Sequence, residues 1–161
     1  MANLGDARRG LFVALDRKKA NCVGCHLVQG AGGTVGPPLI SKLPVDHLLE
    51  SLVRPNAKLA GGHQTVRVRG IDGQEIRGVL LRTGAGSQEL PAIQDANGRV
   101  HLLEKGQFSA PFPDPSSLMP TVGGIGLTHH ELVDLLAFLS STLAVEKTMS
   151  GLVLKAEIYK Q

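Results

Sequence analysis

Large aromatic side chains are scarce in this sequence. The 161 residues include no Trp, one Tyr and four Phe, which is an aromatic fraction of 3%. A chain with so few bulky side chains has little with which to fill a wide interior. The composition is therefore compatible with a core built around a bound apolar cofactor, although it does not require one.

Long apolar stretches are also missing. No segment approaches the roughly 20 apolar residues that a helix needs to cross a bilayer. The first 20 residues lack the apolar stretch of a signal peptide. We therefore expect no membrane span in the chain.

The charge is weak and carries little information about partners. Lys and Arg total 17 against 14 for Asp and Glu, so the formal net charge is +3. The basic residues are scattered, apart from the pairs Arg8-Arg9 and Lys18-Lys19, and no aromatic residues are interleaved with them. We therefore expect no nucleic-acid partner. A weakly basic rim that docks an acidic redox protein is compatible with this balance.

The only two cysteines stand together in the sequence Cys22-Val23-Gly24-Cys25-His26. This spacing places two thiols against the two vinyl groups of one haem, while the imidazole that follows reaches the iron. The sequence therefore predicts one covalently bound haem c with His26 as an iron ligand. A zinc half-site would need two further ligands, and a thioredoxin-like pair would need a βαβ setting. Neither context is indicated around the motif.

The second iron ligand must come from elsewhere in the chain, and Met119 is the best candidate. It lies in a proline-bracketed loop before the last predicted helix, and its thioether is a soft, neutral ligand that raises the reduction potential. Met1 and Met149 are terminal and fit less well. The histidines that would instead give a bis-His iron are His63, His101, His129 and His130. Of these, His63 at the start of the predicted insertion is the first to test.

A metal-bound imidazole usually has its second ring nitrogen held by a carbonyl group, which fixes the tautomer. Pro37 is the candidate for that carbonyl. The sequence Gly36-Pro37-Pro38-Leu39 follows the cysteine motif closely enough to fold back across His26.

Helical periodicity predicts three helices. The first covers residues 5–19 and is opened by Asp6, and the second covers 45–54 and ends at Pro55. The third begins after Thr128, with Glu131 completing a capping box. Residues 29–38 and 104–128 are rich in Gly or Pro and predict loops.

Between these helices the apolar period changes to two. Four alternating segments at about 62–104 contain Asp72-Gly73 and Asn97-Gly98, which are strong hairpin signals. We therefore expect a mainly α protein, 1–161, with a four-stranded antiparallel β insertion at about 62–104. The tail at 143–161 is left unassigned.

Several features occur in a fixed order along the chain. They are Gly10, the motif from Cys22 to His26, Gly36-Pro37-Pro38-Leu39, Met119-Pro120 and the segment LTHHELVDLLAFL at 127–139. In this order the sequence resembles class I cytochromes c. The resemblance implies a cytochrome c fold in which Gly10 allows close approach of Phe138, Pro37 accepts a hydrogen bond from the proximal imidazole, and Leu39 lines the haem.

Three longer segments resemble a more specific group. They are KKANCVGCHLVQGAGGTVGPPL, LLESLVRPNAKLAGGHQTVRVRGIDGQEIRGVLL, and SSLMP with the final helix. They are similar to the haem-binding domain of planctomycete and acidobacterial type, which is often fused to quinoprotein-like dehydrogenase domains, over roughly residues 5–142. A more distant resemblance, in the haem motif and the GPPL sequence, is to the small monohaem subunit of sulfur-oxidising cytochrome pairs.

These observations predict a monohaem electron carrier, not an enzyme, which transfers single electrons between a donor such as a periplasmic dehydrogenase and an acceptor. Alternatives are a haem subunit of a larger oxidoreductase, a haem enzyme or sensor with a labile Met119, and a subunit whose β insertion docks a partner. Haem attachment normally takes place outside the cytoplasm. We therefore expect a periplasmic or otherwise extracytoplasmic protein whose leader is absent from the given sequence.

Overall fold

A computed structural model describes residues 5–28, 30–39, 43–83, 90–141, 144–148 and 151–155. Its helices are α1 (Ala7–Leu15), α2 (Cys22–Cys25), α3 (Val45–Val53) and α4 (His129–Leu139). Its strands are β1 (Leu27–Val28), β2 (Ala31–Gly32), β3 (Thr65–Arg69), β4 (Glu75–Thr83), β5 (Leu90–Asp95), β6 (Val100–Leu102), β7 (Phe112–Pro113), β8 (Ala144–Thr148) and β9 (Gly151–Lys155).

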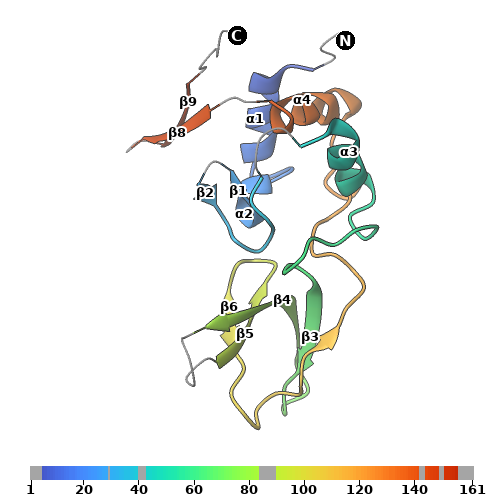
Figure 1. Cartoon of the computed structure of the whole chain (residues 1–161), viewed down its shortest axis with the longest axis vertical. Coiled ribbons are helices and arrows are strands. Elements are labelled where there is room, and N and C mark those ends of the chain that lie inside the picture. Colours follow the sequence, from blue (N-terminus) through green and yellow to red (C-terminus); the bar gives the residue numbers. More distant parts are fainter. Residues whose placement is uncertain are drawn as a thin grey trace.

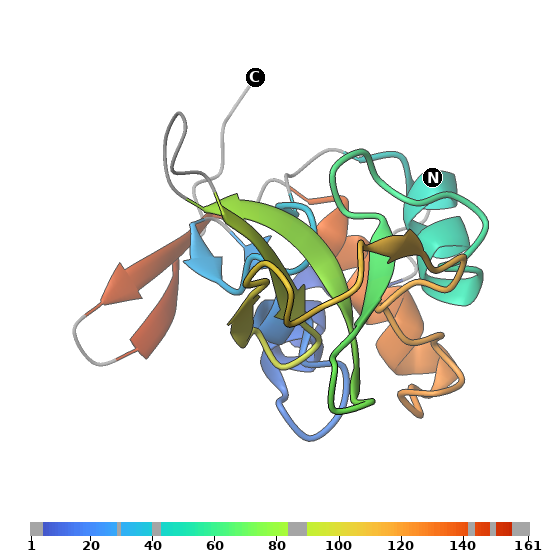
Figure 2. The same cartoon turned by 90° about the horizontal axis from the view of Figure 1, so that it is seen from below.

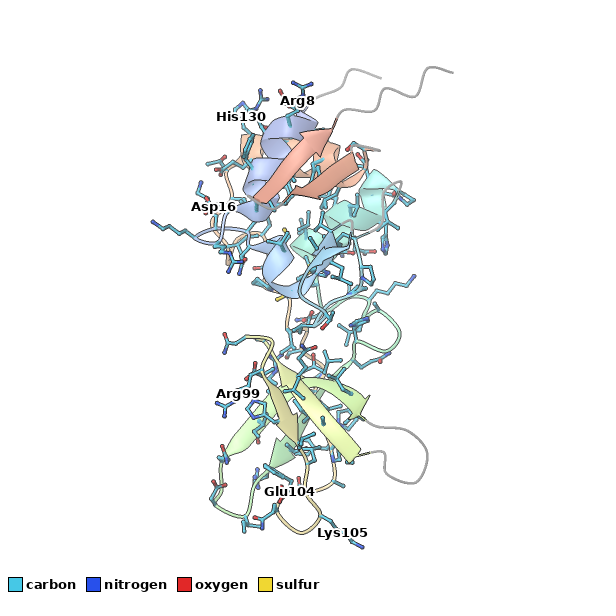
Figure 3. All side chains as sticks on the ribbon, turned by 90° about the vertical axis from the view of Figure 1, so that its left-hand side faces the viewer. Arg8, Asp16, Arg99, Glu104, Lys105 and His130 are labelled. Atoms are coloured by element: carbon cyan, nitrogen blue, oxygen red, sulfur yellow. The ribbon has the colours of Figure 1, made fainter. Side chains whose placement is uncertain are left out.

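The molecule is elongated and has a helical half and a sheet half (Figure 1). Helices α1, α3 and α4 lie together at one end, and strands β3 to β6 lie at the other, with α2, β1 and β2 between them. Figure 3 shows the same separation, because Arg8 and His130 lie at the helical end while Glu104 and Lys105 lie at the sheet end. The chain passes between the halves after α3 and again after β7.

The prediction of a mainly helical cytochrome c fold is wrong. The described helices are short, at 9, 4, 9 and 11 residues, and a five-stranded antiparallel sheet makes up the other half of a mixed α and β structure. The helical resemblance rested on segments near both ends of the chain. The alternating middle segment builds a sheet with a hydrophobic core of its own, so it is more than an addition to a helical protein.

The large sheet has the strand order β6-β5-β4-β3-β7. Both expected hairpins are present: β3 pairs with β4 across Asp72-Gly73, and β5 pairs with β6 across Asn97-Gly98. The glycines of both turns have a positive φ, 82° and 81°, which residues with a Cβ rarely adopt. From below, the sheet lies in front of the helices (Figure 2).

Three short strand pairings were not expected. The fifth strand, β7, pairs with β3 within the segment predicted to be irregular. Strand β2 lies inside the predicted glycine-rich loop and pairs with β1, which immediately precedes that loop. Strands β8 and β9 form a hairpin in the unassigned tail. Strands of two residues are too short to show an alternating pattern, which explains why β1, β2 and β7 were missed.

The described residues form two separate hydrophobic clusters. The cluster of the helical half joins α1, α3 and α4, and its buried members are Leu11, Ala14, Val28, Leu48, Leu52, Leu135, Leu136, Phe138 and Leu139. The cluster of the sheet half is smaller, and its buried members are Val68, Ile76, Ile93 and Leu103. The cysteine motif packs against the cluster of the helical half through Cys22.

Gly10 allows α1 and α4 to touch. A Cβ at this position would clash with the backbone carbonyl of Asp134 and lie 2.7 Å from the Cβ of Phe138. This is the close approach that the resemblance implied. The same crossing holds an ion pair between the exposed Arg9 and the buried Asp134 that the sequence analysis missed. Arg9 Nε donates to Asp134 Oδ2 at 2.7 Å, and the backbone N–H of Asp6 donates to Asp134 Oδ1 at 2.6 Å.

Shortening a buried side chain at the centre of the helical cluster should reduce stability strongly. Leu135 is fully buried at 0% exposure, so Leu135→Ala should lower the free energy of unfolding by about 2–5 kcal/mol. Leu49 on α3 is 40% exposed, and the same substitution there should have a much smaller effect. Urea denaturation of both variants measures the difference, and equal losses would contradict the described packing.

Candidate functional site

Helix α2 presents both cysteines from a single helical turn. Asn21 precedes it in the left-handed conformation, with φ at 42°, and the helix ends at Cys25. Positions i and i+3 share one face of a helix, so the two sulfur-bearing side chains emerge on the same side. His26 follows in an extended conformation, and its N–H donates to Cys22 O at 2.8 Å.

The environment of the thiols does not favour thiolate chemistry. Burial raises the pKa of the Cys22 thiol to about 11, and burial also raises the pKa of Cys25. Reactive Cys-x-x-Cys pairs depend on the opposite shift, towards a low thiol pKa. Both thiols therefore stay protonated at neutral pH, which argues against the thioredoxin-like interpretation.

His26 is held as a neutral imidazole with a defined tautomer. Its Nδ1 lies 2.7 Å from Pro37 O, and because a carbonyl only accepts, the proton must be on Nδ1. Burial lowers the pKa of His26; the bond to Pro37 opposes this shift and the charge of His63 adds to it. In the neutral ring Nε2 then carries the lone pair, which is the form that binds a metal.

The loop after α2 folds back over the motif, as the sequence analysis expected. Gly36 N donates to Cys25 O at 2.8 Å, which brings the Gly36 backbone against the imidazole of His26. A Cβ on Gly36 would lie 2.7 Å from Nδ1 and 2.9 Å from Nε2 of that ring, closer than real Cβ contacts allow. Glycine is therefore required for the ring to occupy this place.

Three of the predicted site residues pack against the same hydrophobic cluster. Cys22, Leu39 and Met119 are all partly buried and all pack against the cluster of the helical half. Met119 is nearly a hundred positions from Cys22 in the sequence, so only the fold brings them to the same cluster.

The alternative histidine ligands have other partners. His63 Nδ1 lies 3.0 Å from Val35 O, beside the loop that holds His26. His101 Nε2 lies 2.9 Å from Asp95 Oδ2 in the sheet half. The remaining two, His129 and His130, are exposed at the start of α4. Met119, which packs against the same cluster as Cys22, therefore remains the candidate for the second ligand.

Within the described ranges, no three His, Cys, Asp or Glu side chains form a group that could hold a metal ion. A zinc site built on Cys22 and Cys25 thus finds no further ligands in that part of the chain. The two thiols and the imidazole of the motif therefore remain the donors from which the site must be interpreted.

Two buried acidic residues were not singled out from the sequence. Asp134 interrupts the apolar face of α4 next to the buried Leu135 and Leu136, and that interruption could have indicated a buried carboxylate with a basic partner. Asp114 lies in a proline-rich segment without periodicity, and no local pattern indicates that it is buried.

Comparison with profiles of known protein families finds no matching family, and comparison with curated proteins finds no similar sequence. In the described parts of the chain, no helix is both long and apolar enough to cross a bilayer. The site must therefore be interpreted from its own geometry.

Proposed function

We propose that this protein is a c-type cytochrome in the chemical sense, with one haem bound covalently, and that it transfers single electrons between redox proteins. In this proposal Cys22 and Cys25 would form the two thioether bonds to the haem, and His26 and Met119 would be ligands of its iron. The observation that carries it is the hydrogen bond from His26 Nδ1 to Pro37 O, immediately after the cysteine pair. This bond orients the ring and prepares Nε2 as a metal ligand, a function that a disulfide motif does not need. Among the described residues no group of three His, Cys, Asp or Glu side chains could hold a zinc ion, which favours haem over zinc.

When bound, the haem supplies the one-electron couple of its iron. The residues of the chain hold it in place and control its surroundings. Pro37 keeps a proton on Nδ1 of His26, so the ring neither rotates nor changes tautomer. The buried side chains that face Cys22, Leu39 and Met119 exclude water from one side of the site. Electron transfer requires such a rigid setting because it is fastest when little rearranges.

The partners that we propose are other redox proteins, such as a periplasmic dehydrogenase and an electron acceptor. We place the protein outside the cytoplasm, where covalent haem attachment normally takes place. This placement and these partners rest on the haem proposal.

The direct test is to export the chain from a bacterium that attaches c-type haem and to weigh the purified protein. We expect a mass increase of one haem, a ferrous pyridine spectrum typical of two thioether bonds, and reversible one-electron reduction. A folded, exported chain without haem would refute the proposal.

Gly36→Ala should disturb the iron through His26. The added methyl group must displace the imidazole or the loop, because it would lie within 3.0 Å of the ring. We expect a weaker bond from His26 to the iron, visible as a larger high-spin fraction in the ferric absorption and electron paramagnetic resonance spectra. Gly61→Ala is the matched control, since no atom lies within 4 Å of its added Cβ. Identical spectra for both variants would contradict the placement of His26.

A further inference from the structure

The segment that carries Met119 is attached to the sheet half, although Met119 itself packs against the helical half. Asp114 directly follows β7, and its N–H donates to Thr65 O at 2.9 Å on β3. From there the chain leaves the sheet and continues towards α4 (Figure 1). Met119 therefore lies within one short crossing segment, whose position depends on how that segment is held.

The side chain of Asp114 anchors the start of this segment. It is completely buried and accepts hydrogen bonds from Arg67 Nε at 2.8 Å and from Arg77 Nε at 2.5 Å. Its other oxygen accepts from the N–H of Ser116 at 2.9 Å. The pKa of this carboxyl group is held well below its usual range, above all by the hydrogen bond from Arg67. The bonds from the Ser116 N–H and from Arg77 act in the same direction. Asp114 thus remains charged and fully bonded at neutral pH.

Arg77 connects this carboxylate to the loop itself. While its Nε bonds Asp114, its Nη2 donates to Ser116 O at 2.8 Å and to Ser117 O at 3.0 Å. The planar fork of an arginine can hold these acceptors at once, whereas the single ammonium of a lysine cannot reproduce the arrangement. One side chain of β4 therefore fixes two successive backbone carbonyls just before Met119.

The last link reaches Met119 through Ser117. The hydroxyl of Ser117 accepts from the N–H of Met119 at 3.0 Å. The N–H of Ser117 donates to Asn56 Oδ1 at 2.7 Å, on the other segment that connects the two halves. A continuous chain of hydrogen bonds thus runs from Arg77 to the backbone of Met119.

We propose that Arg77 is a positioning residue of the haem site, through which the sheet half holds the Met119 thioether on the iron. The inference rests on the proposed function, because it needs a haem and the ligand Met119. A thioether is a neutral, weak ligand, so it stays bound only when its backbone is kept in place. The sheet half, which has no other assigned part in the site, thereby contributes to the reduction potential.

The test compares three haem-loaded proteins: the natural chain, Arg77→Met with Asp114→Asn, and Arg69→Met. The double variant removes the hydrogen bonds to the carbonyls of Ser116 and Ser117. Because Asp114→Asn also removes the buried carboxylate, no charge is left without its partner, and the variant should still fold. Arg69 is a matched control from the same sheet, because among the described residues its exposed guanidinium makes a single, long ion pair, 3.7 Å, with Glu75. The readouts are covalent haem content, the red-edge ferric band that signals sulfur ligation, the pH at which that band is lost, and the midpoint potential.

We expect all three proteins to carry one haem. The control should keep the sulfur band over the same pH range as the natural chain. In the double variant Met119 ligation should weaken at least about tenfold. The sulfur band should then be lost at a pH about one unit closer to neutral than in the natural chain, and the midpoint potential should fall. Arg77→Lys keeps the positive charge but not the planar guanidinium, so it should lose part of the sulfur band over the same pH range.

Two results would count against the inference and differ in meaning. If the double variant keeps the band over the natural pH range, Arg77 does not position Met119, while the proposed function stands. If the natural chain acquires no covalent haem, or acquires haem without the sulfur band, the proposed site fails and the inference fails with it.

Discussion

The variant with both Cys22→Ala and Cys25→Ala should contain no covalently bound haem after export and purification. The chain has two cysteines in all, so no other thiol can form a thioether bond. The mass of the denatured protein measures the loss directly, and a haem stain on a denaturing gel gives the same information. The expected effect is complete, from one haem per chain to none.

Val23→Ala is the matched control for this experiment. Val23 lies within α2 between the two cysteines, so the substitution alters the same helical turn but leaves both sulfurs and their spacing intact. It should retain one haem per chain. Covalent haem in the double cysteine variant, or its loss in Val23→Ala to the same degree, would show that the cysteines are not the attachment points.

The helix starts were predictable because their determinants are local. Asp6 accepts hydrogen bonds from the N–H groups of Arg8 and Arg9, and Thr128 and Glu131 form the expected capping box. Each of these contacts spans no more than three positions, so the sequence pattern contains both partners. The hairpin turns at Gly73 and Gly98 were predictable for the same reason.

The fold class was not predictable in this way. The sequence analysis recognised the alternating segment as strands but treated it as an insertion into a mainly helical fold, because that fold was what the resemblance implied. A fifth strand, β7, joins the sheet through a pairing with β3 that spans more than forty positions. Such a pairing depends on the sheet already being formed, and two residues including Pro113 give no pattern that anticipates it.

In the candidate site, too, contacts between nearby positions could be predicted from the sequence, and contacts between distant positions could not. The bond between His26 and Pro37 spans eleven positions, and the sequence analysis anticipated it because a short glycine-rich loop can return only to a nearby motif. The bonds from Arg77 to the carbonyls of Ser116 and Ser117 span about forty positions. No local feature of β4 distinguishes Arg77 from the other arginines of the sheet, so only the structure connects it with Met119.

Met119→Leu should remove the sulfur ligand while keeping the packing. The two side chains have similar volume, and such exchanges usually cost less than about 1.5 kcal/mol. In the haem-loaded protein we expect the sulfur band of the ferric spectrum to disappear and the sixth position of the iron to accept added imidazole. The midpoint potential should fall by about 100 mV or more, because axial ligands set haem potentials over a range of about 0.8 V.

The decisive comparison is with His63→Ala, since His63 is the histidine that lies beside the loop of His26. If Met119 is the ligand, His63→Ala should keep the sulfur band, and its potential should move much less than that of Met119→Leu. If instead Met119→Leu leaves the spectrum unchanged and His63→Ala alters it, the iron has two histidine ligands. The natural protein would then have a strongly negative potential, because the thioether that raises the potential would be absent. Potentiometric titration of the three proteins separates the two cases.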